Sequence, residues 1–140
     1  MTGEARAFLA ALDDKRASSG EIRNALAVIC LAEGNPAAAL AAVADVLDGT
    51  APVLGSVTVM EAHLLAGLAH RQLGDQRAAS QAAERALALA EPDRLILPFA
   101  MTGSADLLEA LPRHQTAHAA LASPITRWAA CTRSPPTAPW

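Results

Sequence analysis

The side chains best suited to chemistry in this sequence are four histidines and two cysteines. His114 and His118 are four positions apart, a spacing with which one helix can present two zinc ligands. Glu109 is the nearest acidic candidate for a third ligand, but its spacing is not convincing, and a zinc site needs three or four ligands. We therefore expect no metal site and no cofactor.

His63 and His70 are seven positions apart, so they share one face of a predicted helix. Such a pair could bind a metal or carry a proton. The amphipathic pattern around them favours a packing role in a groove between two helices. Cys30 lies in an apolar stretch with no activating base nearby, where cysteine behaves as a small buried hydrophobe. These patterns predict no catalytic residue, and we expect that the protein is not an enzyme.

The composition favours helices that pack closely. Hydrophobic residues make up 52 % of the 140 residues, but only 3 % are aromatic and a quarter are alanine. Alanine has the highest helix propensity, and its small side chain lets two helices approach closely. No stretch alternates β-branched and polar residues as a strand would. The sequence therefore predicts an all-α fold, with a length that fits one domain.

The charge pattern excludes some classes of partner. The net charge is −3 and the eleven basic residues are scattered, so no basic stripe predicts direct nucleic-acid binding. The N-terminal apolar stretch is too short for a signal peptide, and no apolar run approaches a membrane span. Cys30 and Cys131 do not make a disulfide framework. We expect a soluble cytoplasmic protein without a membrane partner.

A helix–turn–helix unit occurs twice, forty residues apart. Gly34 matches Gly74, and Asn35 matches Asp75; further matches are Ala39 with Ala79, Leu47 with Leu87 and Pro52 with Pro92. In each unit the glycine is suited to end one helix, and the following Asn or Asp is suited to cap the next. A fixed period of this size indicates a helical repeat array.

Caps and apolar stripes predict the element order. We expect a first helix over 2–17, with an apolar stripe of Phe8, Leu9 and Leu12. A capping box at Ser18 and Glu21 starts a second helix, which ends at Gly34. Three further helices are expected from Asn35 to Asp48, over 57–73 with Ser56 as the cap, and from Asp75 to Pro92. Residues 1–122 would form one domain: a first helix over 1–19, repeat one over 20–52, repeat two over 57–92, and a C-terminal cap over 93–122. In that cap Pro98 prevents a long helix, Ser104 starts a short one ending at Leu111, and 113–122 adds another. Residues 123–140 contain four prolines and predict a disordered tail.

The two units resemble tetratricopeptide repeats. The family's small residues and turn glycine match Gly67, Gly74, Ala79 and Ala86 in the second unit, and Ala27, Gly34 and Ala39 in the first, where Val46 replaces an alanine. The period is 40 residues instead of 34, and the family's large aromatic positions hold Arg23 and His63 or Cys30 and His70. The resemblance implies a right-handed superhelical array of antiparallel helix pairs, with about two repeats plus capping helices.

A narrower resemblance is to MalT-like regulators of the LuxR family. It covers about residues 20–121 and is carried by the segment from Leu87 to Phe99, which reads Leu-Ala-Leu-Ala-Glu-Pro and then an apolar Leu-Pro-Phe, followed by a short Leu-Leu helix. In those bacterial transcription activators this region precedes a helix-turn-helix. The resemblance implies an effector-sensing or protein-interaction segment. No nucleotide-binding loop and no helix-turn-helix accompany it, so the chain would be a fragment, a truncated relative or a free-standing module.

The tetratricopeptide resemblance also implies a binding surface, because the first helix of each pair lines the concave face in that family. The matched positions are Glu21, Asn24, Val28, Glu61, Leu64, Leu68, Arg71 and Gln72. This mixed lining suits a protein, a peptide or a small effector. Alternatively, these are ordinary surface residues, or they face a missing neighbouring repeat. A second functional hypothesis is a free-standing scaffold or adaptor unrelated to transcription, which self-associates through open repeat ends.

Overall fold

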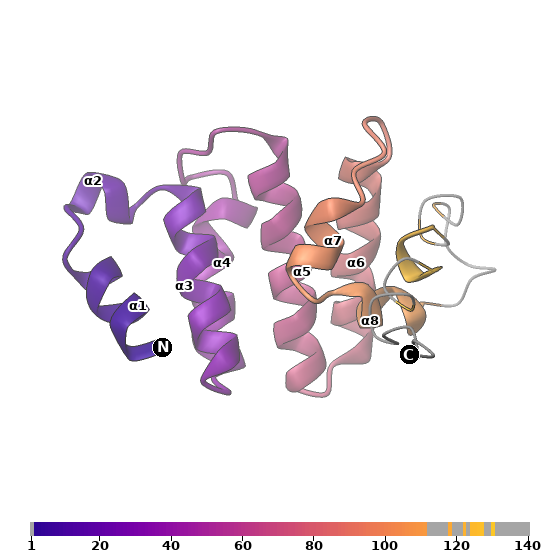
Figure 1. Cartoon of the computed structure of the whole chain (residues 1–140), viewed down its shortest axis with the longest axis horizontal. Helices are drawn as coiled ribbons and strands as arrows, with labels where there is room; N and C mark the ends of the chain where they lie inside the picture. Colours follow the sequence, from indigo (N-terminus) through magenta and orange to yellow (C-terminus); the bar gives the residue numbers. More distant parts are fainter. Residues whose placement is uncertain (1, 112–117, 119–121, 123, 128–129, 131–140) are drawn as a thin grey trace, which may run out of the picture.

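The computed structural model describes residues 2–111, 118, 122, 124–127 and 130. The described residues form helices and connecting loops without a strand, which confirms the all-α prediction. The helices are α1 (Thr2–Ala10), α2 (Asp14–Ala17), α3 (Gly20–Ala32), α4 (Pro36–Leu47), α5 (Ser56–Gln72), α6 (Gln76–Ala90), α7 (Leu97–Met101) and α8 (Ala105–Glu109). They follow one another along the long axis of the molecule, with α1 and α2 at one end and α7 and α8 towards the other (Figure 1).

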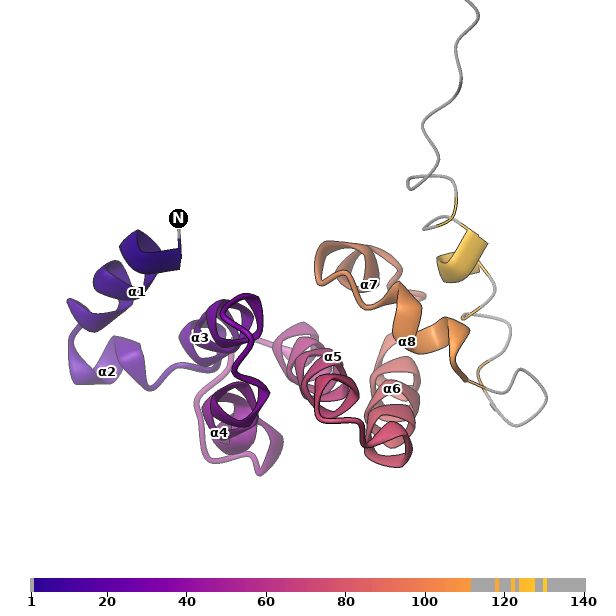
Figure 2. The same cartoon turned by 90° about the horizontal axis from the view of Figure 1, so that it is seen from below.

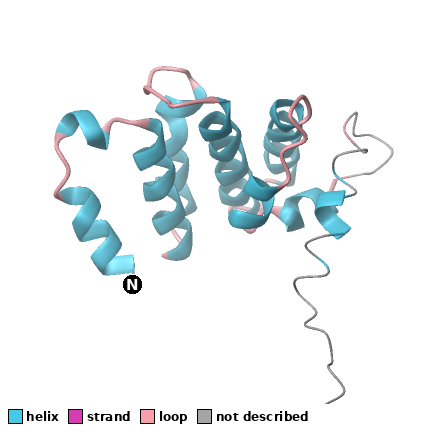
Figure 3. Cartoon of the chain, turned by 45° about the horizontal axis from the view of Figure 1, so that its top comes forward, coloured by secondary structure: helices cyan, strands magenta, loops and turns pink. Residues whose placement is uncertain are grey.

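The four longest helices form two successive pairs, α3 with α4 and α5 with α6. Seen along the helix axes, α3 and α5 lie side by side in one layer, and α4 and α6 lie in a second layer (Figure 2). The two pairs are also in contact, because α5 packs against both α3 and α4. Loops join all of these helices (Figure 3). The architecture is therefore a row of helix pairs.

The turn inside each pair has the same geometry at positions forty residues apart. Gly34 and Gly74 have left-handed φ angles of 72° and 81°. The Asn35 and Asp75 side chains each accept a hydrogen bond from the backbone N–H three residues later, at 3.2 and 3.0 Å. Their own N–H groups donate to the carbonyl five residues earlier, at 2.8 and 2.9 Å. Glycine is the residue that adopts this φ without a steric penalty, so the predicted helix ends and caps are confirmed at both turns.

Two clusters of buried apolar side chains lie along the row. The first joins α3, α4 and α5 and consists of Ala27, Cys30, Ala39, Ala42, Val43, Val46, Ala62, Leu65, Ala66 and Ala69. The second joins α5 and α6 to the C-terminal segment and includes Met60, Leu64, Leu87, Phe99, Leu107, Leu108 and Ile125. Helix α5 contributes to both clusters, which links the two pairs. At Gly67 a Cβ atom would lie 2.9 Å from Leu107 Cδ1 and 3.5 Å from Ala82 Cβ, so the small residue permits the close packing expected from the repeat pattern.

The predicted single helix over 2–17 is wrong, since α1 ends at Ala10 and α2 begins at Asp14. Asp13 has an extended backbone, and its side chain accepts a hydrogen bond from Arg16 N at 2.8 Å, so it caps a new helix instead of continuing the old one. The predicted apolar stripe does not enter the core either. None of the nine residues of α1 is buried, and Phe8 is 67 % exposed.

Two predicted serine caps are also wrong. Ser19 rather than Ser18 caps α3, because Ser18 has a helical backbone conformation at the end of α2, whereas Ser19 is extended and its hydroxyl accepts a hydrogen bond from Ile22 N–H at 3.4 Å. Ser56 is the first residue of α5 instead of its cap. Ser104 lies directly before α8, as predicted, but its hydroxyl donates to the Phe99 carbonyl at 3.1 Å and makes no cap bond to α8 among the described residues. At the start of α3 two adjacent serines could act as the cap, and the backbone conformation at the end of α2 decides between them.

The segment after α6 covers the second cluster. The segment contains only a short helix, α7, as predicted from Pro98, which lies in its first turn, and Phe99 is fully buried. Residues 124–127 are helical and Ile125 is 1 % exposed, which contradicts the predicted disorder at these positions, because this apolar side chain helps to cover the cluster. The other residues of the predicted tail, Ala130 excepted, and most of the predicted 113–122 helix lie outside the described residues. In the part of the chain that the structure describes, none of the helices has the length and apolarity of a membrane span.

Candidate functional site

The predicted binding residues lie on α3 and α5, the two helices that are side by side in Figure 2. Glu21 and Val28 are seven positions apart on α3, as are Glu61 and Leu68 on α5, so each pair projects from one side of its helix. Gln72 Nε2 donates to a carbonyl in the last turn of α3 at 3.5 Å, which connects the C-terminal ends of the two helices. We call the surface formed by Val28, Glu61, Leu68 and Gln72 the α3–α5 face.

The residues of the α3–α5 face are accessible to different degrees. Val28 is 50 % exposed, Gln72 is exposed, and Glu61 and Leu68 are partly buried. Leu68 also packs at the edge of the second core cluster. The face therefore combines two apolar side chains, an acidic one and an amide.

Two of the predicted binding residues lie in the interior. Leu64 is fully buried in the second core cluster. Asn24 is 5 % exposed, and its Nδ2 donates to the backbone carbonyl of Thr58 at 2.9 Å. Helical register places both on the side of the helix that packs against a neighbouring element. In the described structure they contact the chain itself, so their assignment to a binding surface is corrected.

Glu21 also has an internal role. Its Oε1 accepts hydrogen bonds from the Leu54 backbone N–H and from the Thr58 hydroxyl, both at 2.8 Å. The bond from Leu54 N–H is the main cause that lowers the pKa of the Glu21 carboxyl below its usual value. Sequence reasoning missed Thr58, because a threonine in the first turn of a helix carries no distinctive signal. Glu21 thus binds the connection between the two helix pairs, and its assignment to a partner-binding surface is corrected.

The same connection approaches α3 closely at Gly20. Its N–H donates to the Pro52 carbonyl at 2.8 Å, and a Cβ atom here would lie 2.5 Å from Val53 Cγ1. A larger residue would push the connection away from α3. Gly20 and Glu21 together dock residues 52–54 onto the start of α3.

Arg71 lies at the edge of the site and forms an ion pair with Asp106 of α8, with Nη1 and Oδ2 3.9 Å apart. Both side chains are nearly half exposed, so the pair contributes little to stability. Arg71 is thus placed between the predicted surface and the C-terminal segment.

The histidines do not form a metal cluster in the described part of the chain, where no group of three or more His, Cys, Asp or Glu side chains could hold an ion. Burial, with a smaller effect of nearby Arg85, lowers the pKa of His63 below its usual value, so its ring is neutral at pH 7. His70 is partly buried on the same helix. His118 Nδ1 contacts the Glu91 carboxylate, and His114 lies outside the described residues.

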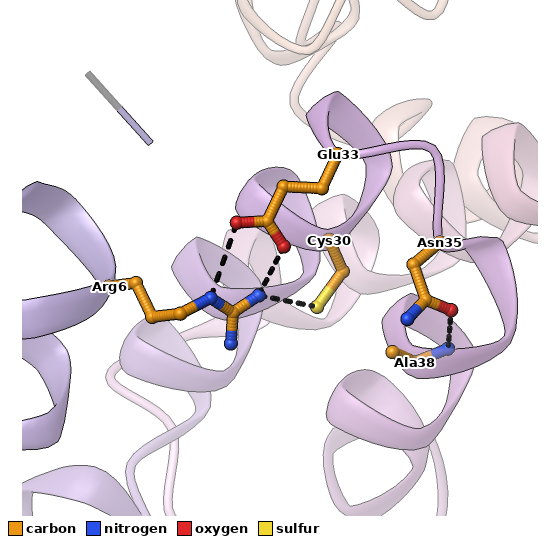
Figure 4. A network of polar contacts seen from close by, with 5 residues as sticks. All are labelled: Arg6, Cys30, Glu33, Asn35 and Ala38. Atoms are coloured by element: carbon orange, nitrogen blue, oxygen red, sulfur yellow. Dashed lines mark hydrogen bonds and ion pairs between the residues drawn. The ribbon is translucent and has the colours of Figure 1, made fainter. Parts of the chain in front are cut away.

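A polar network connects α1 to the C-terminal end of α3 (Figure 4). The Arg6 guanidinium donates to both carboxylate oxygens of Glu33, with Nε and Oε1 3.3 Å apart, and its Nη2 lies 3.8 Å from Cys30 Sγ. The Arg6 hydrogen bond lowers the pKa of the Glu33 carboxyl, and the pair raises the pKa of Arg6. Cys30 is 3 % exposed within the first core cluster, which confirms the packing role predicted for it.

Next to this network, a pocket of about 220 Å³ lies between α3 and the α1–α2 segment. Apolar side chains, among them Leu9, Ile22 and Leu26, line it together with Arg6 and Arg23. No sequence signal predicted this pocket, because it depends on where α1 docks. Comparisons of the chain with protein-family models, with curated proteins and with solved structures find no match.

Proposed function

We propose that this chain is a tetratricopeptide-like interaction module that binds a protein or peptide partner, or a small effector, and that it has no enzymatic activity. The observation that carries the proposal is the α3–α5 face. Val28, Glu61, Leu68 and Gln72 lie on adjacent helices and keep accessible surface, while the facing sides of the helix pairs are filled by the two core clusters. A rigid row of helices with such a face is suited to recognition.

The repeated turn supports the tetratricopeptide-like class. The same glycine conformation, cap and backbone hydrogen bond occur forty residues apart, as expected if each helix pair is one unit of a right-handed superhelix. The resemblance to MalT-like LuxR-family regulators extends the proposal to cytoplasmic transcriptional control. In that role the module would act through its partner or effector and would not itself contact DNA.

The chemistry of the α3–α5 face favours a peptide with one apolar anchor and one basic residue. Val28 and Leu68 offer apolar contact area, and Glu61 offers a carboxylate for a cation. Gln72 can pair with backbone groups, whereas Arg71 next to it is already paired with Asp106. A peptide that carries an apolar and a basic side chain would therefore cover the face.

Peptides selected by display against the full chain provide the test. A double variant, Val28→Glu with Glu61→Lys, should weaken their binding at least about tenfold, since it removes an apolar contact and reverses a charge. The matched control is Ala41→Glu with Gln81→Lys, which places the same two residues at exposed positions on α4 and α6, forty residues apart. Equal losses in both double variants, or no loss in either, would reject the α3–α5 face.

A second candidate function is that of a free-standing scaffold that self-associates. Leu97 and Met101 are four positions apart on α7, so they share a face, and they are 64 % and 77 % exposed. Neighbouring exposed apolar side chains favour association. Light scattering after size-exclusion chromatography of the full chain tests this candidate. A dimer that Leu97→Glu converts to a monomer would support it, and a monomeric wild-type chain would reject it.

A further inference from the structure

The pocket between α3 and the α1–α2 segment is separate from the α3–α5 face. Ile22 and Leu26 are four positions apart and face the pocket, whereas Glu21 and Val28 project from a different side of α3 at 100° per residue. Residues of α1 and α2 line the pocket without filling it, since a volume of about 220 Å³ remains. This leaves a site with apolar walls on the other side of the same helix.

The polar part of the pocket is cationic. Arg6 and Arg23 line it, and the pocket lining contains no acidic side chain. Each arginine has a carboxylate partner outside the lining: Glu33 for Arg6, and Asp45 for Arg23 at 3.5 Å. A guanidinium has five N–H donors, so one carboxylate leaves others available.

One of these donors has no acceptor. Arg23 Nε is buried and makes no hydrogen bond among the described residues. A buried donor without a partner is unfavourable and rare in folded proteins, and an unoccupied ligand site is one of its explanations. This nitrogen has almost no exposed surface, so a ligand in the pocket reaches it only if the Arg23 side chain turns towards the pocket.

We propose that this pocket binds a small monocarboxylate with an apolar body. The carboxylate pairs with Arg23 and Arg6, and the apolar body packs against Leu9, Ile22 and Leu26. The volume of about 220 Å³ accommodates roughly seven atoms, taking the ~30 Å³ share of a water molecule for each. Hexanoate has eight non-hydrogen atoms, one more than this number, and the opening of the pocket to solvent leaves room for the last one. Because such a ligand contacts both α1 and α3, its binding also strengthens the docking of α1.

The test is a calorimetric titration of the full chain with hexanoate, hexylamine and acetate. We expect saturable binding of hexanoate, no binding of hexylamine, and at least about tenfold weaker binding of acetate, which lacks the apolar body. Amide hydrogen exchange in α1 should slow when hexanoate is present. No saturation by hexanoate up to about 10 mM, or equal binding of hexylamine, would overturn the proposal.

Variants then locate the site. Arg23→Gln should weaken hexanoate binding at least about tenfold by removing the charged donor. Leu9→Trp should abolish binding by filling the pocket, and since no α1 residue is buried, this variant keeps the fold even if Arg23→Gln does not. Arg77→Gln removes an exposed arginine from α6 and should leave the affinity unchanged. Unchanged affinity in Leu9→Trp would overturn the assignment to this pocket.

Discussion

Glu21 of α3 and Thr58 of α5 are joined by a hydrogen bond of 2.8 Å between the carboxylate Oε1 and the threonine hydroxyl. The same oxygen accepts the Leu54 N–H, so one atom fixes the inter-pair connection to the first helices of both pairs. The forty-residue period is longer than the 34 residues of tetratricopeptide repeats, and this docked connection between Leu47 and Ser56 accommodates part of the added length.

Removal of this contact should destabilise the protein. We expect Glu21→Ala to lower the free energy of unfolding by about 2 kcal/mol, because two hydrogen bonds to a charged group are lost. Urea denaturation followed by circular dichroism measures the change. Glu61→Ala is the matched control forty residues later, where no hydrogen bond to the carboxylate occurs among the described residues, and it should change stability by less than about 0.5 kcal/mol. Equal effects of the two substitutions would contradict the anchoring role.

The Glu21 carboxyl should also make stability depend on acid pH. Its pKa is lowered in the folded state, so the unfolded chain binds the proton at a higher pH. The stabilisation is complete above the unfolded pKa of about 4.5 and is lost as the pH falls through the folded value. Urea unfolding of wild type and Glu21→Gln between pH 6 and 3 tests this. The variant should lose less stability over that range, and parallel curves would refute the prediction.

Protonation of His63 should cause a second loss of stability on acidification, in a higher pH range than that of Glu21. Burial and nearby Arg85 lower its folded pKa, so the unfolded state takes up the proton first as the pH falls below about 6.5. Stability should therefore decline from pH 7 to pH 5.5. His63→Leu should flatten this decline in urea titrations, and Arg85→Gln should reduce it in part. A slope that is unchanged in His63→Leu would show that other groups cause the decline.

The two equivalent turns should respond equally to mutation. Asn35→Ala and Asp75→Ala should each cost about 1 kcal/mol, because each removes the side-chain acceptor of a helix N-terminus. Asn35→Asp and Asp75→Asn keep an acceptor and should cost much less. Thermal and urea unfolding of the four variants test this. A large difference between the two alanine variants would mean that the turns are not energetically equivalent.

The second core cluster should depend on the C-terminal segment. Phe99→Ala should cost about 3–5 kcal/mol, because this fully buried ring packs with residues of α5 and α6. Met101→Ala, two residues later and 77 % exposed, serves as the control and should cost less than about 0.5 kcal/mol. A small cost in Phe99→Ala would show that α7 does not contribute to the cooperative core.

Helix α1 should open independently of the rest. We expect Arg6→Ala to speed amide hydrogen exchange in α1, because the Arg6–Glu33 contact connects α1 to α3. The unfolding midpoint should stay nearly unchanged, because no residue of α1 is buried. Mass spectrometry of exchange in peptic fragments measures this. Arg16→Ala, on α2, is the control and should leave exchange in α1 as it was. Unchanged exchange in Arg6→Ala would mean that other contacts hold α1.

The elements predicted most accurately are those with strong local signals. Gly34, Asn35 and Pro36 specify a helix end, a cap and a first helical turn within three residues, and the corresponding turn at Gly74 and Asp75 is equally local. The start of α3 was predicted less well, because Ser18 and Ser19 can both act as caps. Their choice depends on how α2 ends, which no short pattern encodes.

The residues of the candidate site were also predicted only in part. The tetratricopeptide resemblance selected positions on the first helix of each pair, but it could not distinguish an accessible side chain from one covered by a neighbouring helix. Leu64 and Asn24 are buried because α6, the C-terminal segment and α5 pack over them. The burial of a side chain depends on which neighbouring helix packs over it, so the sequence pattern of one helix does not predict it.

The sequence by itself determined the helical class and the two equivalent turns, since these depend on propensities and hydrogen bonds between residues at most five positions apart. Only the tertiary structure decided that Glu21 anchors the connection and that Arg6 docks α1 beside a pocket. These contacts join residues 37 and 27 positions apart, and they form only after the intervening helices have packed. Helix packing offsets the entropy cost of bringing these distant residues together, and local sequence does not specify that packing.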